Sequence, residues 1–405
     1  LQWAGNIPYD WNTTKGKYFM AILERPIKDD DGVITCFRNG EVTLRANRRE
    51  DGFTIATVEA GYQGIEPGDL VIHGMDGFAG AIGISDSRGK GTPALNVLAC
   101  SENKKYIMYL LRAMAYTEVF MALSTGIRVR TCDTNWKKLR SLDYLIPPEE
   151  EQQRIADFLD AKCAEIDTLT ADIQTQIDTL EQYKRSVITE TVSKGLNPNA
   201  EMKDSGIQWI GNMPAHWDVI RGKYILRYMQ KPVREDDGVI TCFRDGEVTL
   251  RSNRREDGFT MSDKEIGYQG IDVGDLVVHG MDGFAGSIGI SDSRGKASPV
   301  LNVLDTDQCK RYIMYYLRSM AYSDVFLALA TGIRVRSCDL RWNKLAELSY
   351  PIPPLDEQNA IVKHIDSVLS KADAVIADKK AQLATLDEYK KSLIFEYVTG
   401  KKEVI

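Results

Sequence analysis

The pattern of apolar and polar residues changes once within the chain and then repeats. Residues 1–146 hold short β-branched runs, separated by Gly, Asn and Asp, followed by one helical pattern over about 104–123. Short strands with a single helix predict an α+β domain. The expected strands cover 33–37, 41–45, 69–73, 81–85 and 95–99.

A long helix is predicted directly after this domain. Pro147 and Pro148 precede three glutamates, and no Gly or Pro follows before Gly195. Proline suits the first helical turn because it lacks a donor that would be unpaired there, and carboxylates suit the positive end of the helix dipole. The pattern therefore predicts one helix over 147–195 and, after Pro353 and Pro354, a second over 353–405.

Apolar residues recur at a spacing of seven along the first predicted helix, and the second helix has apolar residues at equivalent places. Such a stripe packs against another helix, so we expect the two helices to form an antiparallel coiled coil rather than two solvated rods. The predicted pairing residues are Leu159, Ile166, Leu169, Ile173, Leu180, Tyr183 and Val187 in the first helix and Ile365, Val375, Leu386, Tyr389 and Leu393 in the second.

The chain is an internal duplication with a shift of 206 residues. The run 32–38 recurs over 238–244, and the run 73–80 recurs over 279–286. This period is far too long for a solenoid repeat, so each copy carries its own core. We therefore predict similar α+β domains over 1–146 and 196–352, each followed by its helix.

Composition and charge narrow the class of protein. The chain has 405 residues, of which 43% are hydrophobic and 27% charged, as in ordinary globular proteins. We find no run long enough for a membrane helix and no signal-peptide pattern, and we expect a cytoplasmic protein without membrane contact. A net charge of −7 disfavours nucleic acid as a partner. The excess negative charge, however, lies mainly on the first predicted helix, because residues 149–199 carry 11 acidic and 5 basic side chains. The globular domains are close to neutral and can hold a basic face.

The sequence offers little for catalysis. Its seven cysteines form no Cys-x-x-Cys pair and its four histidines lack zinc-site spacing, so we expect neither disulfides nor a metal. Methyltransferase and phosphate-loop motifs are missing. The glycine-rich run from Gly74 to Gly83 is interpreted as a turn between strands. His73 and Asp76 could form an acid–base pair there, and this remains an alternative. We predict a chain that is not an enzyme and binds no cofactor itself.

Arginines and asparagines gather in three places in each copy, and these residue types hold phosphates and bind guanine and adenine edges. Taken singly, each is as readily a surface residue paired with a carboxylate. Their grouping in a duplicated domain favours DNA binding. The candidate DNA-binding residues are Arg38, Asn39, Arg45, Asn47, Arg48, Arg49, Arg88, Lys90, Arg128 and Arg130, with Arg244, Asp245, Arg251, Asn253, Arg254, Arg255, Arg294, Lys296, Arg334 and Arg336 in the second copy.

Two motifs resemble those of the DNA-specificity subunit of Type I restriction-modification systems. One is Trp-Ile-Gly-Asn-Met-Pro-Ala-His-Trp over 209–217, matched by 3–11. The other is Ile-Pro-Pro-Leu-Asp-Glu-Gln over 352–358, matched by 146–152. The resemblance covers the whole chain. Because residues 202–206 precede the motif in the second copy, we expect a few natural residues before Leu1.

This resemblance implies a non-catalytic subunit with two target recognition domains, each docking in a major groove of double-stranded DNA, and helices that set their spacing. It further implies two methyltransferase subunits on the helices, forming an adenine-N6 methylase, and ATP-driven restriction subunits. S-adenosylmethionine and ATP would then bind the partners. Because the two domains are close copies, the expected target is an interrupted palindrome, in which one difference such as Asn39 against Asp245 changes a base preference. The alternative is a helical adaptor whose arginines contact only protein.

Overall fold

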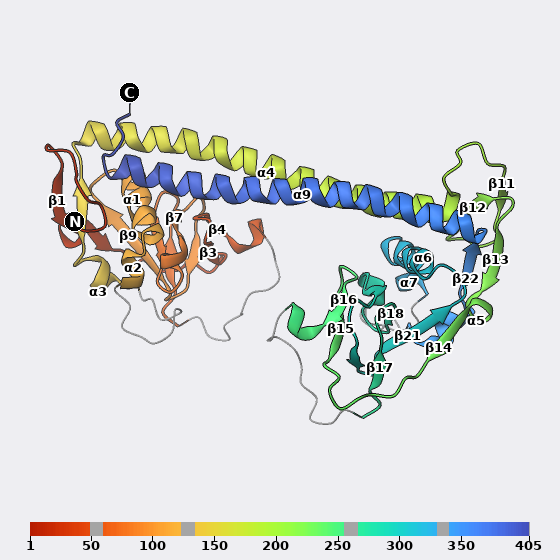
Figure 1. Ribbon diagram of the computed structural model, residues 1–405. Coiled ribbons are helices and arrows are strands. Elements are labelled where there is room, and N and C mark those ends of the chain that lie inside the picture. The colour runs from red at the N-terminus through yellow and green to blue at the C-terminus, as the bar shows by residue number, and fades with distance from the viewer. Residues whose placement is uncertain (49–59, 123–133, 255–265, 330–339, 405) are drawn as a thin grey trace. The chain divides into compact units, whose positions relative to one another are not determined.

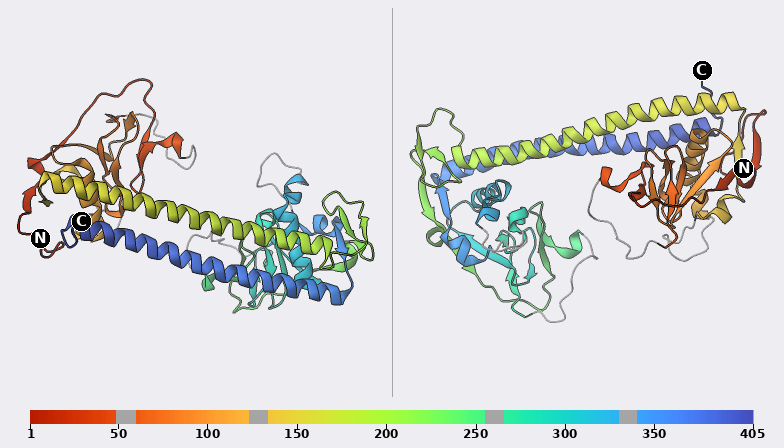
Figure 2. Two further views of the ribbon diagram at one scale, coloured as in Figure 1. Left: turned by 90° about the horizontal axis from the view of Figure 1, so that it is seen from above. Right: turned by 180° about the vertical axis from the view of Figure 1, so that it is seen from behind.

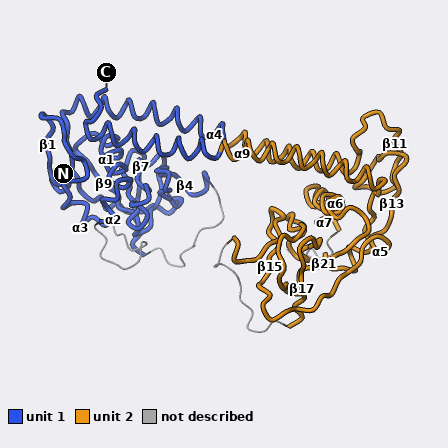
Figure 3. Tube along the Cα trace, viewed as in Figure 1, with its two compact units in different colours: residues 1–173, 380–405 blue, residues 174–379 orange. Residues whose placement is uncertain are grey.

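The computed structural model describes residues 1–48, 60–122, 134–254, 266–329 and 340–404 (Figure 1). The chain divides into two compact units, one made of residues 1–173 and 380–405 and the other of residues 174–379 (Figure 3). Each unit contains one α+β globular part together with one half of each long helix. The 206-residue shift that relates the sequence copies also relates the units, since position 174 corresponds to 380.

Unit 1 contains a four-stranded antiparallel sheet in the order β2-β9-β6-β7 and three two-stranded ribbons. In the sheet, Leu70 lies opposite both Leu98 and Ile84, and the central strand β6 is buried except at its end. The sheet is β2 (Met20–Ile22), β6 (Leu70–His73), β7 (Ile82–Ile84) and β9 (Leu95–Cys100); the ribbons are β1 (Asn12–Lys15) with β10 (Asp143–Ile146), β3 (Ile34–Cys36) with β4 (Val42–Leu44), and β5 (Gln63–Ile65) with β8 (Gly89–Gly91). The five strands that the sequence predicts are therefore confirmed as β3, β4, β6, β7 and β9.

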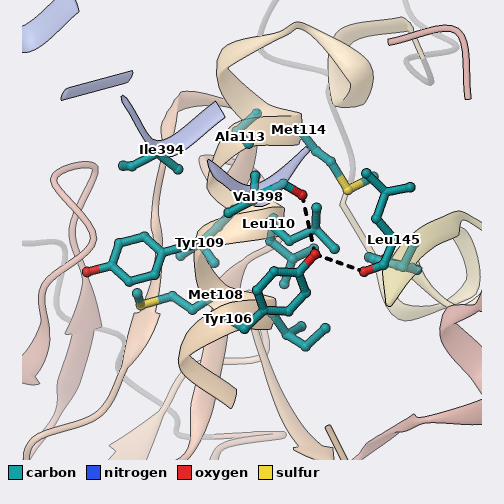
Figure 4. Packing of buried hydrophobic residues seen from close by; sticks show 14 of the residues in the cluster. Tyr106, Met108, Tyr109, Leu110, Ala113, Met114, Leu145, Ile394 and Val398 are labelled. Carbon is teal, nitrogen blue, oxygen red and sulfur yellow. Dashed lines mark hydrogen bonds between the residues drawn. The ribbon is translucent and has the colours of Figure 1, made fainter. Parts of the chain in front are cut away.

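Helix α1 (Lys104–Tyr116) lies at the centre of the larger core of unit 1 (Figure 4). The side chain of Asn103 begins it by accepting bonds from the amides of residues 105 and 106, which satisfies donors that have no partner within the helix. The predicted helix over 104–123 is interrupted at Glu118, whose φ is 59°, and α2 (Val119–Ala122) follows. A short helix α3 (Trp136–Leu139) leads into β10.

The fully buried Tyr106 joins three elements of this core. Its hydroxyl contacts the carbonyl oxygens of Leu145 at 3.1 Å and Val398 at 3.3 Å (Figure 4). A buried hydroxyl needs such partners, so the end of α9 is fixed on the first domain. In unit 2, Tyr312 makes the equivalent bonds to Pro351 and Val192.

Unit 2 repeats this architecture with the same strand orders. Its four-stranded sheet is β14 (Leu226–Met229), β21 (Leu301–Thr306), β18 (Leu276–His279) and β19 (Ile288–Ile290); its ribbons are β13 (Asp218–Arg221) with β22 (Ser349–Ile352), β15 (Ile240–Cys242) with β16 (Val248–Leu250), β17 (Gln269–Ile271) with β20 (Gly295–Ala297), and β11 (Met202–Asp204) with β12 (Asn212–Pro214); its helices are α5 (Gly222–Ile225), α6 (Lys310–Tyr322), α7 (Val325–Ala328) and α8 (Trp342–Glu347).

The two long helices begin where the proline motifs predict. Helix α4 covers Glu149–Lys194 and α9 covers Leu355–Val398. Within each unit the two run antiparallel (Figures 1 and 2). In unit 1, Lys390 pairs with Asp167 at 2.6 Å, and in unit 2, Lys184 pairs with Asp373 at 2.6 Å. The predicted pairing of helices is thus confirmed.

The buried seam between the helices differs in part from the predicted stripe. Leu159, Ile166, Ile173, Ile365 and Leu393 are buried, and Leu180, Val187 and Leu386 are partly buried. The prediction is wrong for four residues with exposed fractions of 47, 51, 44 and 54%, namely Leu169, Tyr183, Val375 and Tyr389.

The four residues are exposed because the second buried row of each helix lies four positions after the first row, not three. A residue four positions further along lies about 40° round the helix, whereas one three positions further lies about 60° to the other side. Cys163 and Ile177, four positions after stripe residues, are buried. All four mispredicted residues lie three positions after a seam position, and Leu169 for example follows Ile166. They therefore point away from the partner helix.

The glutamine of the Pro-Pro motif has a structural function. Gln152 is 1% exposed. Its Nε2 donates to the carbonyl oxygen of Pro147 at 3.0 Å and to Glu102 Oε2 at 2.7 Å, and its Oε1 accepts from the amide of Asn103 at 3.1 Å. The side chain therefore joins the first turn of α4 to the start of α1, as Gln358 does for α9 and α6.

Replacing Gln152 with alanine is expected to lower the free energy of unfolding by about 2 to 4 kcal/mol, because buried groups lose their hydrogen-bond partners. Urea unfolding of the full chain measures the change. The neighbouring Gln153 is the matched control, since its bonds to Asn103 and Asp157 are exposed and its replacement should change stability by less than about 0.5 kcal/mol. Equal losses for both variants would contradict the assignment.

Candidate nucleic-acid interface

The hairpin β3–β4 and the 3-10 helix η2 (Arg45–Asn47) carry the first group of predicted DNA-binding residues. The structure brings Arg48 onto the ring of Phe37, with the guanidinium carbon 4.1 Å from the ring centre. Nη1 of Arg48 also donates to Asn39 Oδ1 at 3.3 Å and to Glu41 Oε2 at 3.1 Å. The aromatic ring and the two acceptors fix the position of the arginine on the hairpin, while 41% of its side chain stays exposed.

Arg38 connects this hairpin to the glycine-rich loop. Its Nη2 lies 2.8 Å from Asp76 Oδ1, and 65% of the side chain is exposed. The loop lies between β6 and β7 and contains η3 (Gly77–Ala79), so its interpretation as a turn is confirmed. Arg38 and Asp76 therefore hold two separate segments of the sequence on one polar surface.

His73 supports the glycine-rich loop from beneath. Burial lowers the pKa of its imidazole, as does the nearby Arg38, against the opposing effect of Asp76. Nδ1 accepts from the amides of Asp76 at 3.1 Å and Met75 at 3.3 Å, which requires this nitrogen to be unprotonated. The ring is thus engaged with backbone and Asp76 with Arg38, which favours a structural function for the pair over acid–base chemistry.

Two further candidates bond within the hairpin. Arg45 Nε donates to Thr35 Oγ1 at 3.2 Å, and Asn47 Nδ2 donates to Thr43 Oγ1 at 2.9 Å. These bonds fix the orientation of η2, and Asn47 remains exposed at its end.

Arg88 is held by carboxylates on separate loops. Its Nε and Nη2 contact the two oxygens of Asp31 at 3.0 and 3.1 Å, and its Nη1 bonds to Glu66. The guanidinium lowers the pKa of Asp31, and the arginine side chain is only 25% exposed. Arg294 is held by Asp237 and Asp272 in the same way. This geometry favours the ion-pair alternative at both positions, and DNA contact there stays a prediction. The adjacent Lys90 and Lys296 lie on β8 and β20.

The second copy places its residues in the same way, with one substitution. Arg254 lies over Phe243 at 4.2 Å and bonds to Glu247 at 3.1 Å, and Arg244 meets Asp282 at 3.2 Å. Where the first copy has Asn39, the second has Asp245, which pairs with Arg254 at 2.6 Å. Arg251 and Asn253 bond to Thr241 and Thr249 as their equivalents do.

The hairpin and the loop border a hollow of about 610 Å³ in unit 2, which is lined by Arg244, Asp245, Arg254, His279 and Asp282 among others. Burial lowers the pKa of His279, as it does for His73. The site thus combines exposed guanidinium groups, two carboxylates and a fixed loop in one concave surface. It suits contact with a polar, anionic partner such as the phosphates and base edges of DNA.

Six of the predicted residues lie outside the described residues: Arg49, Arg128, Arg130, Arg255, Arg334 and Arg336. Phe37 and Glu41 position Arg48, as Phe243 and Glu247 position Arg254, and none of the four is among the residues predicted from the sequence. Their recurrence two positions from Asn39 or Asp245 in both copies was the available signal.

The described residues contain no cluster of three or more His, Cys, Asp or Glu side chains arranged to hold a metal ion. Five cysteines in the described ranges have free thiols. No described helix is long and apolar enough to cross a membrane.

Comparison with known proteins gives one consistent result. No family model matches the sequence. A putative Type I restriction enzyme MjaX specificity subunit of Methanocaldococcus jannaschii is 24% identical over 444 residues, covering 99% of this chain and 95% of the relative. The StySPI specificity subunit of Salmonella potsdam is 20% identical and covers 98% and 90%. A solved chain from a Type I restriction-modification system, described in work on complex assembly and conformational transition, has the same fold with a TM-score of 0.67 at 13% identity, covering 98% and 100%.

Fold and site together define a duplicated α+β protein that carries two equivalent arginine-bearing surfaces on units that share a pair of long helices. The sequences of the curated relatives align with this chain over nearly their whole length. In sequence the chain is similar to specificity subunits of Type I restriction-modification systems, and it shares its fold with a solved chain of such a system.

Proposed function

We propose that this specificity subunit recognises a bipartite DNA target, with one recognition domain over each half-site, and that it contributes no catalytic group of its own. The observation that carries the proposal is the paired surface around Arg38 and Arg48, which recurs around Arg244 and Arg254 with the same stacking and ion pairs. Exposed arginines held at fixed positions suit phosphate contact and guanine contact. For Arg128, Arg130, Arg334 and Arg336 the proposal rests on sequence alone.

The partners follow from the same family. We infer that two methyltransferase subunits bind the long helices and form an adenine-N6 methylase, and that ATP-driven restriction subunits join this complex. S-adenosylmethionine and ATP bind those partners in this proposal. The solved relative, which comes from work on complex assembly, supports an assembled state. Because chromosomal DNA is the substrate, the complex would act in the cytoplasm.

Selection from a random duplex pool tests this function. The complex of this chain with its methyltransferase subunits should enrich one interrupted sequence, and methyltransferase subunits alone should enrich none. Binding that is equal for all sequences, or binding only to protein partners, would support the helical adaptor instead. The salt concentration must be held constant, because phosphate contacts make affinity strongly salt-dependent.

The target is expected to be an interrupted palindrome at the positions that shared residues contact. Helices α4 and α9 run antiparallel in each unit, so we expect the two domains to bind one duplex as an inverted pair. Alike domains then read alike sequences on opposite strands. Sequencing that detects N6-methyladenine in cells with the complete system measures both half-sites. Unrelated half-sites would contradict this prediction and leave the specificity function intact.

A further inference from the structure

The two recognition surfaces differ at the residue that shares a hydrogen bond with the stacked arginine. Phe37, Glu41 and Arg48 have identical counterparts in the second copy, and the stacking distances of 4.1 and 4.2 Å agree. Asn39 in the first surface is replaced by Asp245 in the second. The difference thus lies within an otherwise conserved arrangement of side chains.

Asn39 keeps most of its hydrogen-bonding capacity. Its Oδ1 accepts two long bonds, from Arg48 and from the amide of Glu41, both at 3.3 Å. Within the described part of the chain its Nδ2 donates to no other residue, and the side chain is exposed. An amide with an available donor and a weakly bound acceptor can form the bidentate pair that asparagine makes with adenine.

Asp245 is held much more tightly. Its two oxygens contact the guanidinium of Arg254 at 2.6 and 3.1 Å, and one also accepts from the amide of Glu247 at 3.1 Å. Burial opposes ionisation, but these bonds outweigh it and the pKa of the carboxyl is lowered. A carboxylate offers no donor, and both oxygens of Asp245 are engaged with Arg254 in a charge-assisted bidentate pair.

We infer that Asn39 specifies an adenine in the half-site of the first domain, whereas Asp245, held by Arg254, leaves the symmetry-related position of the other half-site unspecified. The inference rests on the proposed DNA recognition and sharpens it. The target would be palindromic except at one base pair, and that exception would come from a single amide-to-carboxylate replacement.

A second difference between the copies provides a matched control. Ser287 stands where the first copy has Ala81, and it lines the same hollow as Asp245. Its side chain is 1% exposed, and its hydroxyl has no hydrogen-bond partner in the described part of the chain. A residue buried in this way does not reach a base, so Ser287→Ala should leave the half-site unchanged.

The experiment compares wild-type protein with Asp245→Asn, Asn39→Asp and Ser287→Ala in the complete complex, by duplex selection and by mapping N6-methyladenine. Wild type should show one specified adenine without a symmetric counterpart. Asp245→Asn should add adenine at the related position with a preference on the order of 5- to 150-fold, the value for a good bidentate pair. Asn39→Asp should remove the existing preference by a similar factor. Both positions are exposed, so melting temperatures should stay within about 2 °C.

Each other outcome has a definite meaning. Half-sites that are reverse complements at every position in the wild type, or an unchanged target in Asp245→Asn, would overturn the inference while DNA recognition stands. A changed half-site in Ser287→Ala would assign the difference to the hollow and also overturn it. If no sequence is enriched by any variant, the proposed function fails and the inference with it.

Discussion

Replacing Arg112 with methionine is expected to lower the free energy of unfolding by about 3 to 5 kcal/mol and to abolish specific DNA binding. Arg112 lies on α1 and is 8% exposed. Its Nε donates to the carbonyl oxygen of Ile82 at 2.8 Å, and its Nη2 donates to that of Gly40 at 2.9 Å. Gly40 forms the turn of the hairpin with a φ of 87°. The arginine therefore ties the proposed DNA-binding hairpin to the core.

Methionine fills much of the same volume, so its effect isolates the lost hydrogen bonds from the effect of a cavity. Arg318 is the equivalent residue of the second copy. Its Nη2 contacts the carbonyl oxygen of Asp245, but its buried Nε has no hydrogen-bond partner among the residues that the structure describes. Arg318→Met should therefore cost less than Arg112→Met. Denaturant unfolding with a separate measurement of DNA binding checks both variants. Equal losses in the free energy of unfolding at the two positions would show that the hydrogen bonds of Arg112 do not decide stability.

Seven residues added to both long helices should lengthen the spacer between the half-sites by about three base pairs, since seven residues extend a helix by about 10.5 Å and base pairs lie about 3.4 Å apart. The half-sites themselves should not change. Insertion after Ile173 and after Lys379 preserves two ion pairs between the helices. The pair of Asp167 with Lys390 lies on one side of the insertions, and the pair of Lys184 with Asp373 lies on the other. A whole heptad shifts the seam by only about 20°.

The control carries the insertion in α4 alone. One helix then has seven residues without a partner, so the seam is out of register on one side and both stability and methylation should fall. Methylation mapping reads the spacer directly. An unchanged spacer in the double insertion, with methylation preserved, would exclude the helices as the element that sets the distance.

Much of the fold follows from local sequence patterns. Proline followed by acidic residues located both helix starts within two residues, and short β-branched runs bounded by Gly, Asn and Asp located five strands of the first copy. The seam was partly wrong because a spacing of seven does not say whether the second buried row lies three or four positions further along. That choice depends on the partner helix, as the exposure of Leu169 and burial of Cys163 show.

The candidate site was less predictable for a related reason. Arg48 and Arg88 look alike in sequence, each near a glycine and an acidic residue. Their surroundings differ because Arg88 meets Asp31 and Glu66 from two distant segments, whereas Arg48 meets neighbours on its own hairpin. Contacts between segments far apart in the chain do not follow from spacing, and they decide which arginine remains available to a ligand.

The ribosome completes unit 2 before unit 1, because the two units are built from different segments of the chain. Unit 2 is one continuous stretch, residues 174–379, whereas unit 1 needs residues 380–405 as well. Leu393, Ile394 and Val398 belong to the core around Tyr106. The N-terminal domain is synthesised first, but part of its apolar core stays uncovered until the last half of α9 has been made. By then the second unit has been translated in full. Domains usually fold as they emerge, and exposed apolar surface favours aggregation, so in this protein the vulnerable interval during synthesis belongs to the N-terminal domain.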